Sequence, residues 1–202
     1  MRKILFFIDL FLVVACQPTA KKVETVPVPN VRVRNTEGGI SFQNGVLMYQ
    51  NQPFSGWLTV DFPNGQKAEE TPFLNGKEEG WATKWYENGQ IAEKRLYKNG
   101  KKEGLHESWW SDGKPRFAYQ FENDLHHGFR REWYASGSMA TQFNYAEGQE
   151  VGRQEGWYEN GKMRFNYEVR NGRLYGLTGV KNCMTVWDET TKKFIEKRIV
   201  ER

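Results

Sequence analysis

The sequence predicts an all-β protein, an elongated single-layer antiparallel sheet of tandem β-hairpin repeats. The first observation is a glycine series with a constant interval of 24 residues: Gly56, Gly80, Gly104, Gly128, Gly152 and Gly176. The second is the composition, with eight Trp, nine Tyr and thirteen Phe, and twenty Gly against seven Pro. Aromatic residues favour short strands, glycines favour tight turns, and a fixed period of this length is typical of a repeat array.

Residue pairs that favour a turn occur at the same place in every repeat. Pairs that favour a two-residue type I′ turn lie between two strand-like runs: Asn64-Gly65, Asn88-Gly89, Asp112-Gly113, Ser136-Gly137 and Asn160-Gly161. We therefore expect a type I′ hairpin in each unit. A second set of pairs, Asn75-Gly76, Asn99-Gly100 and Asn171-Gly172, is expected to open a charged link to the next hairpin.

Aromatic side chains recur with the same period. The first strand of each unit ends in a pair: Trp85-Tyr86, Trp109-Trp110, Trp133-Tyr134 and Trp157-Tyr158. Adjacent residues of a strand face opposite ways, so the two rings of a pair are predicted on opposite faces. In the second strand, Phe143 and Tyr145 are two residues apart and share a face. Such rings are expected to stack along the array, because one hairpin alone is too small to bury them.

The unit G-x-x-x-x-W-Y-x-N-G resembles the MORN repeat variant of bacteria, often labelled as a YwqK-type antitoxin family. The segment from Gly80 to Gly104 is the clearest copy, and the resemblance covers about residues 56 to 180. It implies a sheet of successive hairpins and no catalytic residues. The pattern departs from the family in the first unit, where Asp61 replaces Trp, and after Gly176, where the Trp-Tyr pair is absent.

The N-terminus is typical of an exported protein. Residues 1–15 carry Arg2 and Lys3 before a short apolar run, which indicates a signal peptide. The run ends in Val-Val-Ala before Cys16, which resembles the lipobox of bacterial lipoproteins and predicts acylation of Cys16. The alternatives are a plain secretory signal with an incidental Cys16, and a cytosolic protein with an apolar N-terminus. A lipoprotein would lie in the cell envelope, and Gln17 favours the outer membrane where there is one.

Five segments are expected along the chain. Residues 1–15 form the signal peptide, and 16–38 the acylated Cys16 and a flexible tether. Residues 39–55 form a partial repeat or N-terminal cap, 56–176 the five MORN-like repeats, and 177–202 a C-terminal cap with a frayed tail. Caps are expected because open sheet edges invite aggregation.

No catalytic motif is evident, so we expect no enzyme activity, cofactor or metal site. His106, His126 and His127 occupy positions that are predicted to lie on the surface. Cys183 is interpreted as a small buried side chain of the C-terminal cap, with a reactive thiol or a metal ligand as the alternatives. The net charge of +4 comes from interleaved acidic and basic residues, which gives little reason to expect nucleic acid as a partner.

The aromatic row is therefore the candidate binding site. It comprises Trp85, Trp109, Trp133 and Trp157 with Tyr86, Trp110, Tyr134 and Tyr158. The leading hypothesis is a membrane-anchored, non-catalytic scaffold that binds another envelope or secreted protein, with self-association possible. The alternatives are an immunity or antitoxin protein that neutralises a toxin, and a module that binds lipid headgroups.

Overall fold

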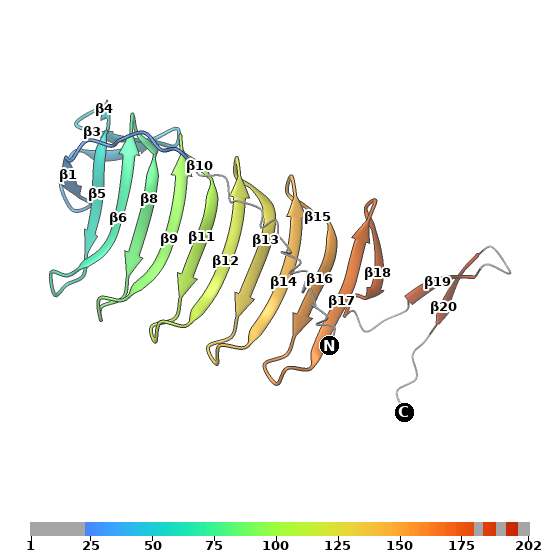
Figure 1. Ribbon diagram of the computed structural model, residues 1–202. Coiled ribbons are helices and arrows are strands. Elements are labelled where there is room, and N and C mark those ends of the chain that lie inside the picture. The colour runs from blue at the N-terminus through green and yellow to red at the C-terminus, as the bar shows by residue number, and fades with distance from the viewer. Residues whose placement is uncertain (1–22, 180–183, 189–192, 198–202) are drawn as a thin grey trace, which may run out of the picture.

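The computed structural model describes residues 23–179, 184–188 and 193–197. Within these ranges the regular secondary structure consists of strands, which confirms the all-β fold class. The predicted signal peptide, Cys16 and Cys183 lie outside the described residues. The dominant element is one long, mostly antiparallel sheet of successive hairpins, whose strands curve in the same sense along the array (Figure 1).

The main sheet has 15 strands. In sheet order its path is β1 (Arg32–Arg34), β5 (Gly56–Asp61), β6 (Lys67–Leu74), β8 (Gly80–Trp85), β9 (Ile91–Lys98), β11 (Gly104–Trp109), β12 (Pro115–Glu122), β13 (Leu125–Trp133), β14 (Met139–Ala146), β16 (Gly152–Trp157), β17 (Met163–Arg170) and β18 (Arg173–Leu177). Three two-residue strands pair off this path: β7 (Lys77–Glu78), β10 (Lys101–Lys102) and β15 (Gln149–Glu150). From β5 onward, sheet order follows chain order, so each unit contacts only its neighbours.

The turn within each unit differs from the predicted type I′ geometry. In the second unit the Gly89 N–H donates to the Tyr86 carbonyl (2.9 Å), and the Tyr86 N–H donates to the Gln90 carbonyl (2.8 Å). Gly89 has φ of 81°, whereas Asn88 is not among the residues with positive φ. This is a type I turn closed by a glycine bulge at Gly89. The strand register shifts once more farther from the turn, between Lys84 and Trp85.

The type I′ turns occur instead at the other end of the hairpins. Asn75 and Gly76 have φ of 50° and 76°, and Asn99 and Gly100 have φ of 51° and 77°. These pairs were expected to open a charged link. They are hairpin turns, because the residues that follow form β7 and β10, which pair back onto β6 and β9. The turns at the two opposite ends of the hairpins are therefore of two different types.

The first end of the sheet is closed by a small second sheet. Its strands are β2 (Ile40–Gln43), β3 (Val46–Tyr49) and β4 (Gln52–Pro53), and they lie beside the first hairpins in Figure 1. Leu47 of β3 and Phe54, which follows β4, pack with Phe73 and Val33 in a buried cluster. The Leu47 N–H donates to the Gly76 carbonyl over 2.8 Å, so the small sheet is also tied to the first type I′ turn.

Ordered structure begins inside the range that was expected to be a tether. Strand β1 pairs in parallel with β5, and its central residue Val33 is buried. Before β1 the chain runs across the ends of the first strands (Figure 1), where the Val26 N–H donates to the Glu79 carboxylate over 3.0 Å. The stretch available as a tether is therefore shorter than residues 16–38.

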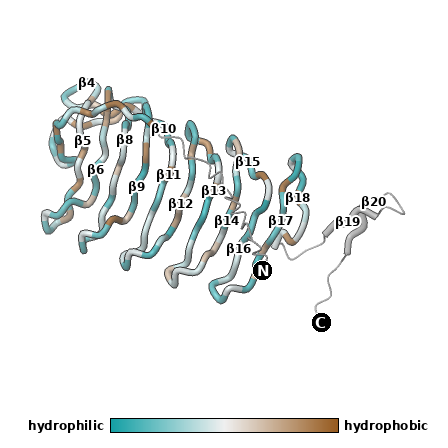
Figure 2. The backbone as a smooth tube through the Cα atoms, in the orientation of Figure 1, coloured by the Kyte–Doolittle hydropathy of each residue, from teal (hydrophilic) through white to brown (hydrophobic). Residues whose placement is uncertain are grey.

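The other end of the sheet is β18, all of whose side chains are exposed. Strands β19 (Met184–Asp188) and β20 (Lys193–Lys197) form a separate antiparallel hairpin. Figure 2 shows hydrophilic and hydrophobic stretches side by side along the main strands. This distribution is expected of a sheet that presents two faces to its surroundings.

Two glycines with similar backbone angles provide a test of this architecture. A Cβ on Gly76 would lie 2.2 Å from Val46 Cγ1 and 2.7 Å from the Leu47 carbonyl, whereas a Cβ on Gly89 would meet nothing within 4 Å. Both substitutions incur the strain of positive φ, about 1–2 kcal/mol. We expect Gly76→Ala to cost a further 1–3 kcal/mol, roughly the penalty of overpacking. Thermal unfolding of the two variants measures the difference, and equal melting temperatures would contradict the docking of the small sheet on the turn.

Candidate functional site

The main sheet has two chemically distinct faces, and alternate side chains along β11 point to one face or the other. His106 and Ser108 point to one face, and Leu105 and Trp109 point to the other. We call the first the ladder face and the second the indole face. The small sheet of β2–β4 packs on the ladder face. Phe73 and Leu58 contact the small sheet, and both side chains point to the ladder face, since Phe73 pairs with Gly56 and Leu58 pairs with Thr71 in the strand register.

Stacked rings run along the ladder face from unit to unit. Successive ring centroids lie 4.4 to 6.3 Å apart along the series Tyr97, His106, Phe121, His126, Tyr145, Phe143, Phe165 and Tyr167. Edge-to-face and offset ring pairs add to the free energy gained by burying the rings themselves. The ladder expected from the second strands is therefore present, and rings from β11 and β13 fill the places between them.

The predicted surface positions of His106 and His126 are wrong. His106 is 2% exposed, and its Nε2–H donates to the Leu96 carbonyl over 2.8 Å. His126 is partly buried and stacks on Phe121 with centroids 4.4 Å apart. His126 takes a place where other units carry a charged residue, such as Lys102, but both histidines act as ladder rings. His127 is exposed, as predicted.

Both ladder histidines are neutral near pH 7. Burial lowers the pKa of His106 to about 4, although the Leu96 carbonyl acts in the opposite direction. Burial also lowers the pKa of His126, and the nearby cations Arg130 and Lys102 lower it further. An uncharged imidazole can therefore occupy the ladder without a counter-ion.

The tyrosines of the predicted aromatic row brace one unit against the next. The Tyr86 hydroxyl donates to the Trp109 carbonyl over 2.9 Å, and the Tyr134 hydroxyl donates to the Trp157 carbonyl over 2.9 Å. At the equivalent place Trp110 offers only an indole N–H, which is buried without an acceptor among the described residues. Tyr158 is 53% exposed. These four residues therefore do not share the role of the tryptophans that precede them in the sequence.

The tryptophans form a continuous stripe together with aliphatic residues. Trp85, Trp109, Trp133 and Trp157 are all partly buried and occupy equivalent register positions on the indole face. Each is paired across the hairpin with an apolar residue on the same face: Ile91, Pro115, Met139 and Met163, respectively. We call these eight residues the indole stripe. Ile91 and Met163 are 36% and 44% exposed.

Sequence reasoning missed the aliphatic half of this stripe. Its signal was available, since each aliphatic residue follows the turn glycine by two positions, as Ile91 follows Gly89. The predicted two-residue turn would have placed these residues differently in the register. The bulge shifts the register by one residue and brings each aliphatic side chain opposite its tryptophan.

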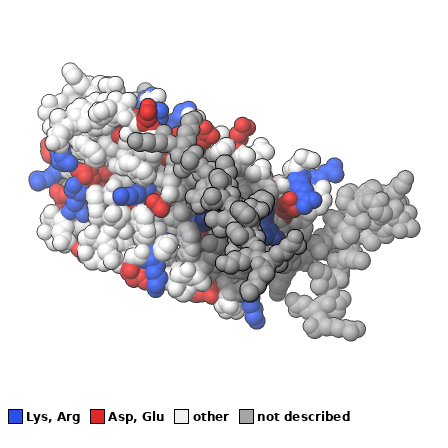
Figure 3. All heavy atoms as spheres, viewed as in Figure 1, with Lys and Arg blue, Asp and Glu red and all other residues white. Residues whose placement is uncertain are grey.

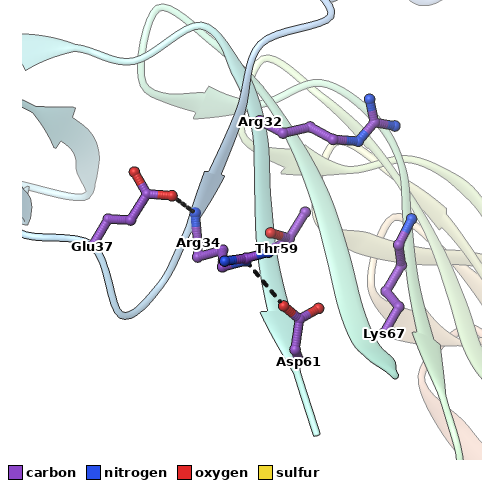
Figure 4. Close-up of a pocket in the computed structure, with 6 residues that line it drawn as sticks. All are labelled: Arg32, Arg34, Glu37, Thr59, Asp61 and Lys67. Carbon is purple, nitrogen blue, oxygen red and sulfur yellow. Dashed lines mark hydrogen bonds and ion pairs between the residues drawn. The ribbon is translucent and has the colours of Figure 1, made fainter. Parts of the chain in front are cut away.

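The stripe is bordered by charges of both signs. At its first end, Lys67 takes the aliphatic position and its Nζ lies 5.4 Å from the centroid of the Trp85 ring. Beyond it a polar cavity of about 340 Å³ lies between β1 and β5, where Arg34 reaches Asp61 over 3.2 Å (Figure 4). Figure 3 shows acidic and basic side chains interspersed on the face in view. Arg34 and Lys67 at this end are both paired with carboxylates, so they form a solvated border and not a concentrated field.

No group of three or more potential metal-ligand side chains occurs within the described parts of the chain. Over the same residues there is no helix long and apolar enough to cross a membrane. A cavity of about 660 Å³ lies beside Phe62 and Tyr86 near the hairpin turns and is open to the surface.

Acid should weaken the ladder through His106. Its pKa in the unfolded chain is near 6.5, so the folded state binds fewer protons between pH 6.5 and 4. The stability contributed by the neutral ring is present above pH 6.5 and is lost as the pH falls toward 4. We expect His106→Phe to flatten this decline and exposed His127→Gln to leave it unchanged. Melting temperatures measured from pH 7 to pH 4 provide the comparison, and an unaltered decline in His106→Phe would contradict the assignment.

Removing the tyrosine braces should affect stability and not recognition. Tyr86→Phe and Tyr134→Phe each delete one hydrogen bond between units, which contributes about 1 kcal/mol. Chemical denaturation should show that loss in each variant. Partner capture, described below, should remain at the level of the wild-type chain; a loss of capture at unchanged stability would assign the hydroxyls to the binding surface instead.

Comparison with known families supports the repeat assignment. Two segments, residues 78–99 and 150–171, match the model described as MORN repeat variant. The two segments begin 72 residues apart, which is three repeat intervals, and each runs from a short strand through one long hairpin to the following type I′ turn. Among curated proteins, no match was found. The chain therefore contains MORN-variant repeats at two positions in the same phase of the array.

Proposed function

We propose that this protein is a non-catalytic binding module of the cell envelope that holds another protein along the indole stripe. The observation that carries the proposal is the stripe itself: alternating indole and aliphatic side chains, partly exposed, at equivalent places in four consecutive units. MORN repeats are in general modules that bind proteins or lipids, so the match at two positions supports a binding role.

The dimensions of the stripe suit an extended segment of a protein partner. Trp85 and Trp157 lie on strands six steps apart in the sheet, which corresponds to about 29 Å at the usual strand spacing. An extended chain covers that length with about nine residues. Tryptophan and methionine are enriched in protein interfaces, where large apolar side chains fill pockets in the partner.

The charge pattern favours a protein over a lipid surface. Binding to anionic headgroups needs a cluster of uncompensated cations. At the first end of the stripe the cations are matched by a carboxylate, since both Arg32 and Lys67 pair with Glu70. A mixed border of this kind surrounds the apolar centre of many protein interfaces.

The proposed location rests on the N-terminal sequence. Cys16 would carry the acyl chains, and at least two are needed for stable anchoring because one alone is marginal. The residues between Cys16 and β1 would hold the sheet near the membrane surface. A toxin that arrives from outside the cell is one class of partner compatible with this location, which corresponds to the immunity alternative.

The partner can be sought by capture of the full-length protein from native membranes after chemical crosslinking. The test variant combines Trp109→Ala, Trp133→Ala and Trp157→Ala. The control is Trp81→Ala, which removes an exposed tryptophan at the other end of β8, outside the stripe. We expect one envelope or secreted protein with the wild type and with the control, and its loss with the triple variant at unchanged circular dichroism. Recovery of the same protein by the triple variant would refute the role of the stripe.

Vesicle binding decides the lipid alternative. Salt-sensitive sedimentation of the protein with anionic vesicles, but not with neutral ones, would replace the protein-partner proposal with headgroup binding.

The anchor is tested separately. Cys16→Ser should abolish incorporation of a labelled fatty acid and move the protein from the membrane to the soluble fraction. An unchanged membrane fraction in this variant would contradict acylation at Cys16 as the anchor. This result bears only on location, so it can fail while the binding role stands.

A further inference from the structure

A further cavity lies on the opposite face from the indole stripe. It has a volume of about 340 Å³ and is lined mainly by Lys102, Phe117, Tyr119, Phe121, His126 and Arg130. These residues come from β10, β12 and β13, so the cavity spans the junction between the third and fourth hairpins. Because His106 also lines it and Trp109 faces the other way on the same strand, the two sites do not overlap.

Aromatic rings form the walls of the cavity. Phe117 and Tyr119 stack with centroids 4.4 Å apart and planes 11° apart, and Phe121 stacks on His126 at 4.4 Å and 28°. Stacked pairs on both sides leave flat apolar surfaces against which a planar or aliphatic side chain can pack.

Two of the three cations at the cavity already have a carboxylate on their own strand. Arg130 Nη2 lies 2.7 Å from Glu132 Oε1, and Arg95 pairs with Glu93. The guanidinium of Arg130 also lies over the Tyr119 ring, 5.1 Å from its centroid. These two arginines are therefore largely neutralised and held in place.

Lys102 is the uncompensated cation. Its Nζ lies over the Phe121 ring, 5.3 Å from the centroid, and within the described residues it makes no ion pair with a carboxylate. Two carboxylates lie near Lys102 without pairing with its Nζ: burial raises the pKa of Glu78, and Asp124 accepts a hydrogen bond from the Lys102 backbone N–H over 2.7 Å. The cavity therefore offers one ammonium group without an ion pair, beside an apolar wall.

We propose that this cavity binds a single carboxylate side chain, Asp or Glu, of an extended partner peptide. Lys102 Nζ donates to the carboxylate, and a neighbouring apolar side chain of the peptide packs on Phe117 and Tyr119. One ammonium group without an ion pair matches one carboxylate. A phosphate, with close to two negative charges, would be repelled by Glu132 and Glu93 and would leave charge unbalanced in a partly buried site.

The chain offers a matched control for this proposal. Lys101 and Lys102 are adjacent on β10, so their side chains point to opposite faces. Lys102→Gln and Lys101→Gln therefore remove the same charge from the same short strand, and only the first removes it from the cavity. Both side chains are at least partly exposed, so neither change opens a hole in the fold.

The probe is a labelled, end-blocked pentapeptide with one glutamate flanked by phenylalanines, compared with the same peptide carrying glutamine. Fluorescence anisotropy with the full-length protein in detergent should show about tenfold tighter binding of the glutamate peptide. The preference should persist in Lys101→Gln and fall to about one in Lys102→Gln. Equal binding of the two peptides by the wild type, or equal loss in both variants, would overturn the proposal.

Inorganic phosphate supplies the second arm of the experiment. Phosphate should compete poorly with the glutamate peptide, at concentrations no lower than those of acetate. Competition by phosphate at far lower concentrations than acetate would assign the cavity to phosphate and reject the carboxylate. Since the indole stripe is not involved, the Trp109, Trp133 and Trp157 variant should bind the peptide as the wild type does, which separates this inference from the proposed function.

Discussion

A sheet one layer thick has no second layer against which to bury its side chains, and this constraint governs the whole molecule. Burial must come from the neighbouring hairpin in the same sheet, so rings have to meet in register from unit to unit. The ladder from Tyr97 through His106, Phe121 and His126 meets this requirement. The fixed repeat length follows, because inserting one residue would send every subsequent ring to the other face.

The constraint also gives the two faces of the sheet different roles. Structural rings occupy the ladder face, where the small sheet of β2–β4 closes the first end. Tyr86 and Tyr134 add hydrogen bonds between units, which leaves the tryptophans beside them free to form a surface. The indole stripe is then left free by the packing within the sheet. The cavity at Lys102 lies on the ladder face, at the junction between the third and fourth hairpins.

The repeat, the hairpins and the tryptophan row could be predicted from the sequence, because glycine spacing and strand alternation are local signals. The turn type could not be read from Asn88-Gly89, since the same pair suits a type I′ turn and a type I turn with a bulge. Because of this ambiguity, the position of Ile91 and its equivalents opposite the tryptophans could not be predicted. The burial of His106 depends on Tyr97 and Phe121 from neighbouring strands, and β1 depends on a parallel pairing with β5, so neither had a local signal.

The central claim is that a partner protein lies along the indole stripe. A photo-crosslinking amino acid placed at Ile91, on the stripe, and in a second variant at Lys84, exposed on the ladder face of the adjacent strand, tests it most directly. Irradiation of cells that carry each variant should give a crosslinked envelope or secreted protein from position 91 and none of that protein from position 84. The same product from position 84 alone, or no product from position 91, would contradict the account.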